Sequence, residues 1–292
     1  MSYDLYFTSP RITLEEFRSY FAERPNYELN NNQVLYENED TGVYFGFDHN
    51  AEPPDDEDDV EHSVVFNLNF YRPHYFALEA EPEVSSFVRH FDCSIHDPQN
   101  EGMGDGSYST EGFLKGWNHG NEFGYSAILG GENAPDSVFS RATDELEGIW
   151  RWNFLRNERN DSIGKDIFIP RIMFAMIDGA LRSFCIWPDA ISTLIPQVEF
   201  LWIPREEMAP RSFFGKAKED TCVIPFGDAL PVLESCHVDE FEFDAYELPS
   251  PNPPVSFKKF VRSLTPFAGE HSGVSIDSIL NREWVVKYRK ED

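Results

Sequence analysis

The sequence predicts an α+β protein built mainly from antiparallel sheets with flanking helices. Two patterns support this prediction: short runs in which apolar and polar residues alternate, and longer runs in which apolar residues recur at helical spacing. Of the 292 residues, 41% are hydrophobic and 15% are aromatic, which excludes a chain that is disordered over most of its length. At this length the elements fill either one large domain or two smaller ones.

The N-terminal third of the chain is typical of a sheet with a helix after its first strand. Residues 3–7 alternate and predict a strand. Thr13 and Glu16 have the spacing of a capping box, so we expect a helix from there to about residue 23. Turn residues separate the next three β-type runs, which predict a meander: residues 27–30, 33–37 and 42–47.

The strongest strand signal follows a long acidic segment. Residues 63–71 alternate throughout, with Val64 and Phe66 on the apolar side. Over residues 76–91 the apolar side chains recur at helical spacing and predict a second helix. Together these elements favour a sheet with its helices on one face.

A polar, glycine-rich stretch at residues 98–136 marks the expected boundary between two halves. We expect an N-terminal subdomain at 1–110, a connecting segment at 111–139 with only a short helix, and a C-terminal subdomain at 140–292. One continuous domain with a long surface connection is the alternative.

The second half of the chain predicts another mainly antiparallel sheet. A helical segment spans about 140–157, and Asp178-Gly179 predicts a tight hairpin between two strands. Further strands are expected at 197–203, 221–226 and 239–248, with a terminal strand at 284–289. Short helices are expected at 228–236, 256–263 and 276–281.

The charge balance narrows the range of partners. Asp and Glu number 52 against 24 for Lys and Arg, so the formal net charge is −28. Nucleic acids and anionic lipid surfaces bind through basic side chains, and we therefore expect neither partner. The same field accelerates association with a basic protein.

The N-terminal residues and the cysteines predict a cytoplasmic protein. The first residues have no basic region followed by an apolar one, which disfavours a secretory signal. The four cysteines have no metal-type spacing and are too sparse to cross-link this chain, so they are expected to be reduced and structural: Cys93, Cys185, Cys222 and Cys236.

No local motif identifies an enzyme, and we expect no catalytic residue, metal or cofactor. The glycines at 102–106 follow no strand and enclose an acid, unlike a phosphate loop. Neither a nucleophile elbow nor an HExxH motif is present. His49 and His62 flank the acidic segment, and a divalent metal site there is the alternative to a solvated loop.

Two acidic clusters are the candidate partner-binding surfaces. The first is a loop between two strands, and the second is the outward face of the strand expected at 239–248, whose apolar face would carry Phe241 and Phe243. Their carboxylates are expected to pair with Lys and Arg of a protein partner: Asp55, Asp56, Glu57, Asp58, Asp59 and Glu61 in the loop, and Asp239, Glu240, Glu242 and Asp244 on the strand.

Three segments, YDLYF, FNLNFYRP and FIPRIMFAMIDG…WPDAISTLIPQVEFLWIPRE, resemble those of acidic immunity proteins encoded beside bacterial toxins of type VI or other polymorphic secretion systems. The resemblance is one of general pattern over most of the chain. It implies a cytoplasmic inhibitor that binds its cognate toxin and occludes the toxin's active site. The acidic charge points to a nuclease as the toxin, with carboxylates that imitate nucleic acid. The alternatives are a hydrolase whose active site is assembled from distant residues, and a regulatory or adaptor protein that binds a basic partner.

Overall fold

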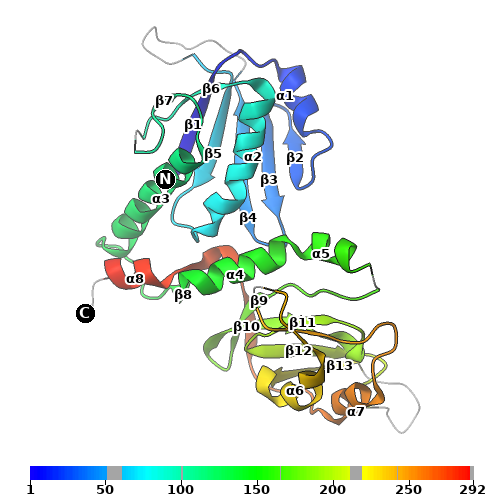
Figure 1. Cartoon of the computed structure of the whole chain (residues 1–292). Coiled ribbons are helices and arrows are strands. Elements are labelled where there is room, and N and C mark those ends of the chain that lie inside the picture. The colour runs from blue at the N-terminus through cyan, green and yellow to red at the C-terminus, as the bar shows by residue number, and fades with distance from the viewer. Residues whose placement is uncertain (51–60, 100, 165, 211–218, 242, 290–292) are drawn as a thin grey trace. The chain divides into compact units, whose positions relative to one another are not determined.

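The computed structural model describes residues 1–50, 61–99, 101–164, 166–210, 219–241 and 243–289, and it has the predicted α+β fold. The chain divides into two compact units (Figure 1). The first comprises Met1–Glu147 with Asp277–Asp292, and the second comprises Gly148–Ile276. Within the described residues, the helices are all too short or too polar to cross a membrane.

A seven-stranded sheet with the order β2-β3-β4-β5-β1-β6-β7 is the centre of the first unit, and its neighbouring strands are all antiparallel. The predicted first strand, capped helix, meander and second helix are all present. The elements up to the second helix are β1 (Ser2–Ser9), α1 (Leu14–Phe21), β2 (Tyr27–Asn30), β3 (Gln33–Asn38), β4 (Val43–His49), β5 (Val64–Asn69) and α2 (Tyr75–Phe91). They are followed by β6 (Ser94–His96), β7 (Asp105–Gly106), α3 (Thr110–Leu129) and β8 (Phe139–Arg141).

One face of this sheet is buried under helices and holds an aromatic core. Thr13 and Glu16 form the predicted capping box of α1. Phe7 and Phe47 of the sheet lie 4.9 and 5.1 Å, between ring centroids, from Phe87 of α2. Figure 1 shows α2 lying across the sheet. Burial of these rings removes large apolar areas from water, and this packing stabilises the sheet.

The expected connecting segment is instead largely a long helix, α3. Its glycines recur every four residues and lie on one side of the helix. A Cβ atom at Gly116 would lie 2.7 Å from the hydroxyl of Tyr3, and one at Gly120 would lie 2.1 Å from the ring of Phe70. The glycines therefore allow α3 to approach the sheet closely, although they resemble linker residues in the sequence.

The C-terminal residues belong to the first unit, so its boundaries differ from the expected ones. The strand β17 (Ile279–Asn281) pairs in parallel with β8, and α8 (Arg282–Tyr288) packs on α3. Of the helix expected at 276–281, only the 3-10 helix Ile276–Ser278 is present, and it leads into β17. The terminal strand expected at 284–289 is wrong, since α8 occupies those residues.

Strands β13, β12, β10, β9 and β16 form, in that order, a five-stranded sheet in the second unit, antiparallel except for the pair β10 and β12. A three-stranded sheet has the order β11-β15-β14. The strands are β9 (Met173–Ile177), β10 (Ala180–Ile186), β11 (Leu194–Pro196), β12 (Phe200–Arg205), β13 (Asp220–Pro225), β14 (His237–Val238), β15 (Ala245–Glu247) and β16 (His271–Val274). The helical elements are α4 (Thr143–Phe154), which begins in the first unit, α5 (Arg156–Ile163), η1 (Pro188–Ala190), α6 (Phe226–Leu233), η2 (Glu234–Cys236) and α7 (Val255–Ser263).

The predicted hairpin at Asp178-Gly179 is confirmed. Ile177 pairs with Ala180, and both turn residues have positive φ angles of 48° and 79°, as a type I′ turn requires.

Beyond β10, the buried Trp187 packs its ring against Phe257 of α7 at 6.1 Å between centroids. These contacts place η1 and α7 side by side in the second unit.

Candidate functional site

The first predicted acidic cluster lies almost entirely outside the described residues. Asp55, Asp56, Glu57, Asp58 and Asp59 fall in the segment 51–60, and only Glu61 is described. The side chain of Glu61 is 67% exposed, and its carboxylate lies 3.7 Å from the guanidinium of Arg11. The residues that flank the segment are joined, because the backbone N–H of Asn50 donates to the carbonyl of Ser63 at 2.8 Å.

Within the described residues, the side of the first sheet away from the helices carries polar and acidic residues in register across its strands. We call it the open face and define it as the side of β1–β7 opposite the aromatic core. Asp4 lies opposite Asn67, whose amide donates a hydrogen bond to the Asp4 carboxylate. Asn67 lies opposite Gly46, and Gly46 lies opposite Leu35. Since opposing residues of paired strands share a face, this row crosses four strands on one side of the sheet.

A second row runs beside the first. Tyr6 lies opposite both Val65 and His96, while Asp48 lies opposite Val65 on the other side. Burial together with the charge of Asp4 raises the pKa of the Tyr6 hydroxyl. The open face carries five carboxylates and, in the described strands β1–β7, no Lys or Arg; the carboxylates belong to Asp4, Glu28, Glu37, Asp48 and Asp105.

A shallow hollow of about 270 Å³ lies on the open face. Gly46, which has no side chain, and Leu35, which is 44% exposed, form the floor of the hollow. Glu28 and Asp48 are among the residues at its edges. An apolar floor between two carboxylates is suited to the stem and the charged end of a lysine or arginine side chain.

His49 and His62 face different surroundings, which argues against the metal site considered as an alternative. His49 is buried, with its Nε2 atom 2.9 Å from the carbonyl oxygen of Ile12 and its ring 5.5 Å from that of Phe17. His62 instead stacks edge-on against Tyr6, on the open face. The alternation of side chains along β4 sends His49 into the core and Asp48 outward.

The second predicted acidic cluster is largely a hairpin loop, and the strand expected at 239–248 is present only as β15, Ala245–Glu247. Strands β14 and β15 pair as an antiparallel hairpin, and the acidic residues form the connection between them. Phe241 packs on Trp152 at 5.7 Å between centroids, and Phe243 lies against Gly148, so both aromatic side chains turn inward as expected. Of the predicted carboxylates, Asp239, Glu240 and Asp244 are exposed, and Glu242 lies outside the described residues.

Two of these carboxylates flank His237. Its Nδ1 atom lies 3.3 Å from Asp239 and its Nε2 atom lies 3.3 Å from Asp244. Among the described residues this is the one group of three with the proximity of a metal site. Because the carboxylates face opposite nitrogens of a single ring, the arrangement fits an exposed ion-pair cluster better than ligation of one shared ion.

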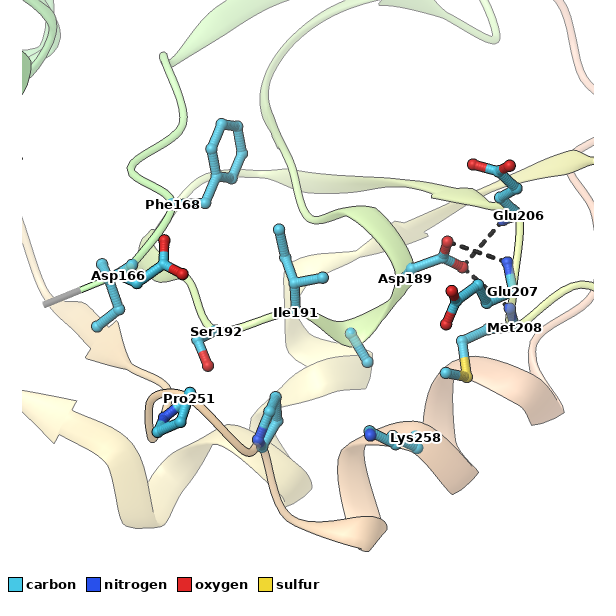
Figure 2. Close-up of a pocket in the computed structure, with 13 residues that line it drawn as sticks. Asp166, Phe168, Asp189, Ile191, Ser192, Glu206, Glu207, Met208, Pro251 and Lys258 are labelled. Atoms are coloured by element: carbon cyan, nitrogen blue, oxygen red, sulfur yellow. Dashed lines mark hydrogen bonds between the residues drawn. The ribbon is translucent and has the colours of Figure 1, made fainter.

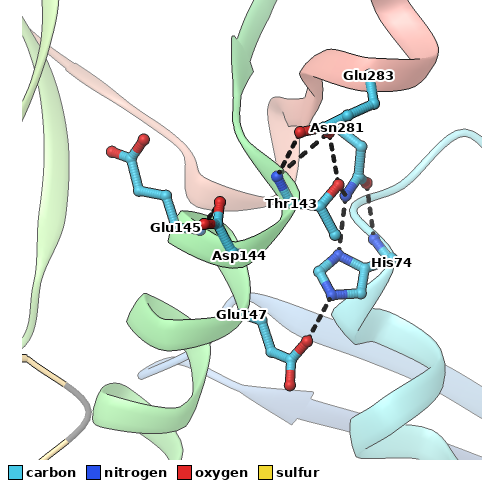
Figure 3. A network of polar contacts seen from close by, with 7 residues as sticks. All are labelled: His74, Thr143, Asp144, Glu145, Glu147, Asn281 and Glu283. Atoms are coloured by element: carbon cyan, nitrogen blue, oxygen red, sulfur yellow. Dashed lines mark hydrogen bonds and ion pairs between the residues drawn. The ribbon is translucent and has the colours of Figure 1, made fainter.

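The sequence patterns did not reveal a polar network in the first unit (Figure 3). The amide of Asn281 donates to Nδ1 of His74 and to the hydroxyl of Thr143, both at 2.9 Å. The Thr143 hydroxyl donates to Glu283 at 2.6 Å, and Nε2 of His74 lies 3.4 Å from Glu147. Burial outweighs the nearby carboxylates and lowers the pKa of His74.

This network joins segments that are distant in the sequence. His74 precedes α2, Thr143 begins α4, and Asn281 ends β17. The hydroxyl of Thr143 is directed to a carboxylate rather than to the imidazole, so the network lacks the contact between nucleophile and base that covalent catalysis needs. Through Asn281 it attaches the C-terminal segment to His74 and Thr143.

A scan against protein-family models finds no match for this chain, and searches of curated proteins and of solved structures find none either. Of the chain's own surfaces, the open face is the candidate functional site.

Proposed function

We propose that this chain is an immunity protein that binds a basic protein toxin, a nuclease, and covers the toxin's active site. The observation that supports the proposal best is the open face, with five carboxylates and no Lys or Arg on the described strands β1–β7. A surface of one sign attracts a partner of opposite sign and speeds their encounter.

The chemistry of a nuclease explains why such a surface inhibits. Nucleases hold phosphates with Lys and Arg side chains and with backbone N–H groups. Carboxylates form short, charge-assisted hydrogen bonds with the same basic side chains. A toxin that docks on the open face would therefore lose access to its substrate through both charge pairing and steric cover.

The ordered sheet and the aromatic core behind the open face favour binding. Its strands are hydrogen-bonded to their neighbours, and their inward side chains pack in the aromatic core. Little conformational entropy is lost when such a surface binds, because its backbone is already ordered. In the proposed complex, the hollow between Glu28 and Asp48 receives one basic side chain of the toxin.

The test is protection of growing cells. The toxin domain is the variable C-terminal domain of the secreted protein expected to be encoded directly upstream, and the chain is co-expressed with it. We expect wild-type protein to restore growth. The double variant Glu28→Lys/Asp48→Lys is expected to bind the toxin about tenfold more weakly or worse, because two favourable contacts become repulsive.

A matched control separates local contacts from total charge. Glu23→Lys/Glu132→Lys changes the net charge equally at two exposed residues outside the open face and is expected to bind like wild type. Association should also slow at least tenfold between about 20 and 150 mM salt. Equal weakening by both double variants, or a chain that neither binds the toxin domain nor protects cells, would refute the proposal.

A further inference from the structure

The second unit contains a pocket of about 680 Å³ that the proposed function does not use. Its wall combines the segment before β9, the turn that includes η1, the residues after β12 and the start of α7. Figure 2 shows Asp166 at one end, Glu206 and Glu207 at the other, and Ile191 between them. A cavity of this size is in the range that binds a ligand or a short peptide segment.

The end of the pocket that carries Glu206 and Glu207 is held in place by the carboxylate of Asp189. Asp189 accepts hydrogen bonds from the backbone N–H groups of Glu206, Glu207 and Met208 at 2.9, 3.1 and 3.0 Å. These contacts bind the turn after β12 to η1 (Figure 2). The side-chain carboxylates of Glu206 and Glu207 are not part of this attachment, and both residues are exposed.

The η1 turn presents an apolar side chain between the two acidic ends. Asp189 and Ala190 have φ angles of 47° and 55°, a left-handed conformation that crowds the Cβ atom of any residue but glycine. The following residue, Ile191, is 42% exposed, while its carbonyl accepts the indole N–H of Trp187 at 3.1 Å. The side chain of Phe168 adds a second exposed apolar surface to the wall.

The charge of the pocket is strongly negative. Its described lining includes four carboxylates, those of Asp166, Asp189, Glu206 and Glu207, and a single ammonium, that of Lys258. In the described part of the chain, Lys258 forms no ion pair with any of the four. A ligand that complements this wall carries positive charge toward both ends and an apolar group between them.

We infer that this pocket binds an extended protein segment in which two basic side chains flank an apolar residue. One basic side chain pairs with Asp166, and the other pairs with Glu206 and Glu207. The apolar residue packs on Ile191 and Phe168. The site lies in the second unit and consists of residues other than those of the open face, so it stands apart from the immunity function proposed above.

Binding of a tripeptide to the full chain tests the inference. The probe is acetyl-Arg-Val-Arg-amide, and the control peptide carries citrulline, the neutral analogue of arginine, at both ends. We expect saturable shifts of the backbone amide resonances of Ile191 and Met208 with the arginine peptide. The citrulline peptide is expected to bind at least tenfold more weakly, since it lacks both charges.

Charge-neutral variants locate the contacts. Glu206→Gln/Glu207→Gln keeps the backbone N–H groups that donate to Asp189 and is expected to weaken peptide binding roughly threefold to thirtyfold. Asp166→Asn is expected to weaken it further and independently, because it lies at the other end of the pocket. Glu132→Gln/Glu158→Gln removes two exposed charges outside the pocket and should leave the affinity unchanged.

Three results would overturn the inference. They are equal binding of the citrulline peptide, unchanged affinity in Glu206→Gln/Glu207→Gln, and spermidine that binds more tightly than the peptide, which would identify a free polyamine as the ligand. Glu28→Lys/Asp48→Lys should bind the peptide normally. Loss of peptide binding at the pocket and loss of toxin binding at the open face are therefore measured separately.

Discussion

The first unit buries an ionisable acid and the second unit buries a base, and the two side chains have different partners. In the first unit, Glu79 of α2 is 1% exposed and accepts hydrogen bonds from the side chains of Tyr36, Asn38 and Thr41 at 2.7 to 3.1 Å. In the second unit, Arg205 is also 1% exposed and pairs through two nitrogens with the carboxylate of Asp220, at 2.7 and 2.9 Å.

The difference shows two ways to stabilise a charge away from water. Tyr36, Asn38 and Thr41, which donate to Glu79, are neutral and belong to β3 and the turn that follows it, so removal of one of these donors leaves the other two in place. Arg205 is matched by an opposite charge and by the carbonyls of Val261 and Leu264. Its removal leaves Asp220 without the guanidinium, so the second arrangement should be the more fragile.

The largest expected effect is therefore the loss of Arg205. Arg205→Met keeps much of the apolar stem but removes every donor, and we expect it to lower the free energy of unfolding by about 3–5 kcal/mol. Urea denaturation followed by tryptophan fluorescence measures the change. The pocket should also be lost, because Glu206 and Glu207 directly follow this residue.

The matched control is Arg182→Met. Arg182 pairs with Glu199 at 2.8 Å but is 42% exposed, so its loss should cost no more than about 1 kcal/mol. Similar costs for the two arginine variants would contradict the distinction between a buried pair and an exposed one.

An intermediate effect is expected at Glu79. Glu79→Gln keeps the shape of the side chain but directs an N–H₂ group toward donors, and we expect a loss of about 1–3 kcal/mol. Tyr36→Phe removes one donor alone and should cost about 0.5–1.5 kcal/mol. Thermal unfolding of both variants tests the order. A larger loss for Tyr36→Phe would contradict the expectation that changing the carboxylate costs more than removing one of its donors.

The smallest effect is expected in the pH dependence of the first unit, at His74. Because burial lowers its pKa below the usual 6.5, the unfolded chain binds this proton more readily than the folded one. Stability should therefore be unaffected by His74 above about pH 6.5 and should fall as the pH drops below it. Near His74, Glu147 and Glu283 act against this shift.

His74→Gln removes the titrating group and tests this sign. Between pH 7.5 and 5.5 the variant should lose less stability than wild type, as measured by urea denaturation at each pH. An acid loss that is identical in both proteins would assign the pH dependence to other groups.

Local patterns predicted the elements that depend on near neighbours in the chain. The capping box at Thr13 and Glu16, the alternation over residues 63–71 and the turn at Asp178-Gly179 are all present as predicted. Each rests on hydrogen bonds or periodicities within a few residues, which propensity and spacing describe well.

Patterns failed where contacts between distant residues decide the structure. The glycines of α3 predicted a connecting segment instead of a helix. The rings of Tyr3 and Phe70, which leave no room for larger side chains, lie far away in the sequence. The residues at 276–289 exchanged helix and strand, since pairing with β8 and packing on α3 outweigh local preference. Of the acidic strand expected at 239–248, only Ala245–Glu247 is a strand, because Phe241 and Phe243 before it pack against α4.

The sequence by itself determined the α+β class and the acidic charge, from which a basic partner is proposed. These properties depend on composition and on short periodicities, which need no knowledge of the third dimension. Only the tertiary structure decided where the carboxylates gather. The open face requires the register of seven strands, and the pocket requires segments as distant as Asp166 and Lys258 to converge. Such convergence is set by packing across the whole unit, which no local pattern encodes.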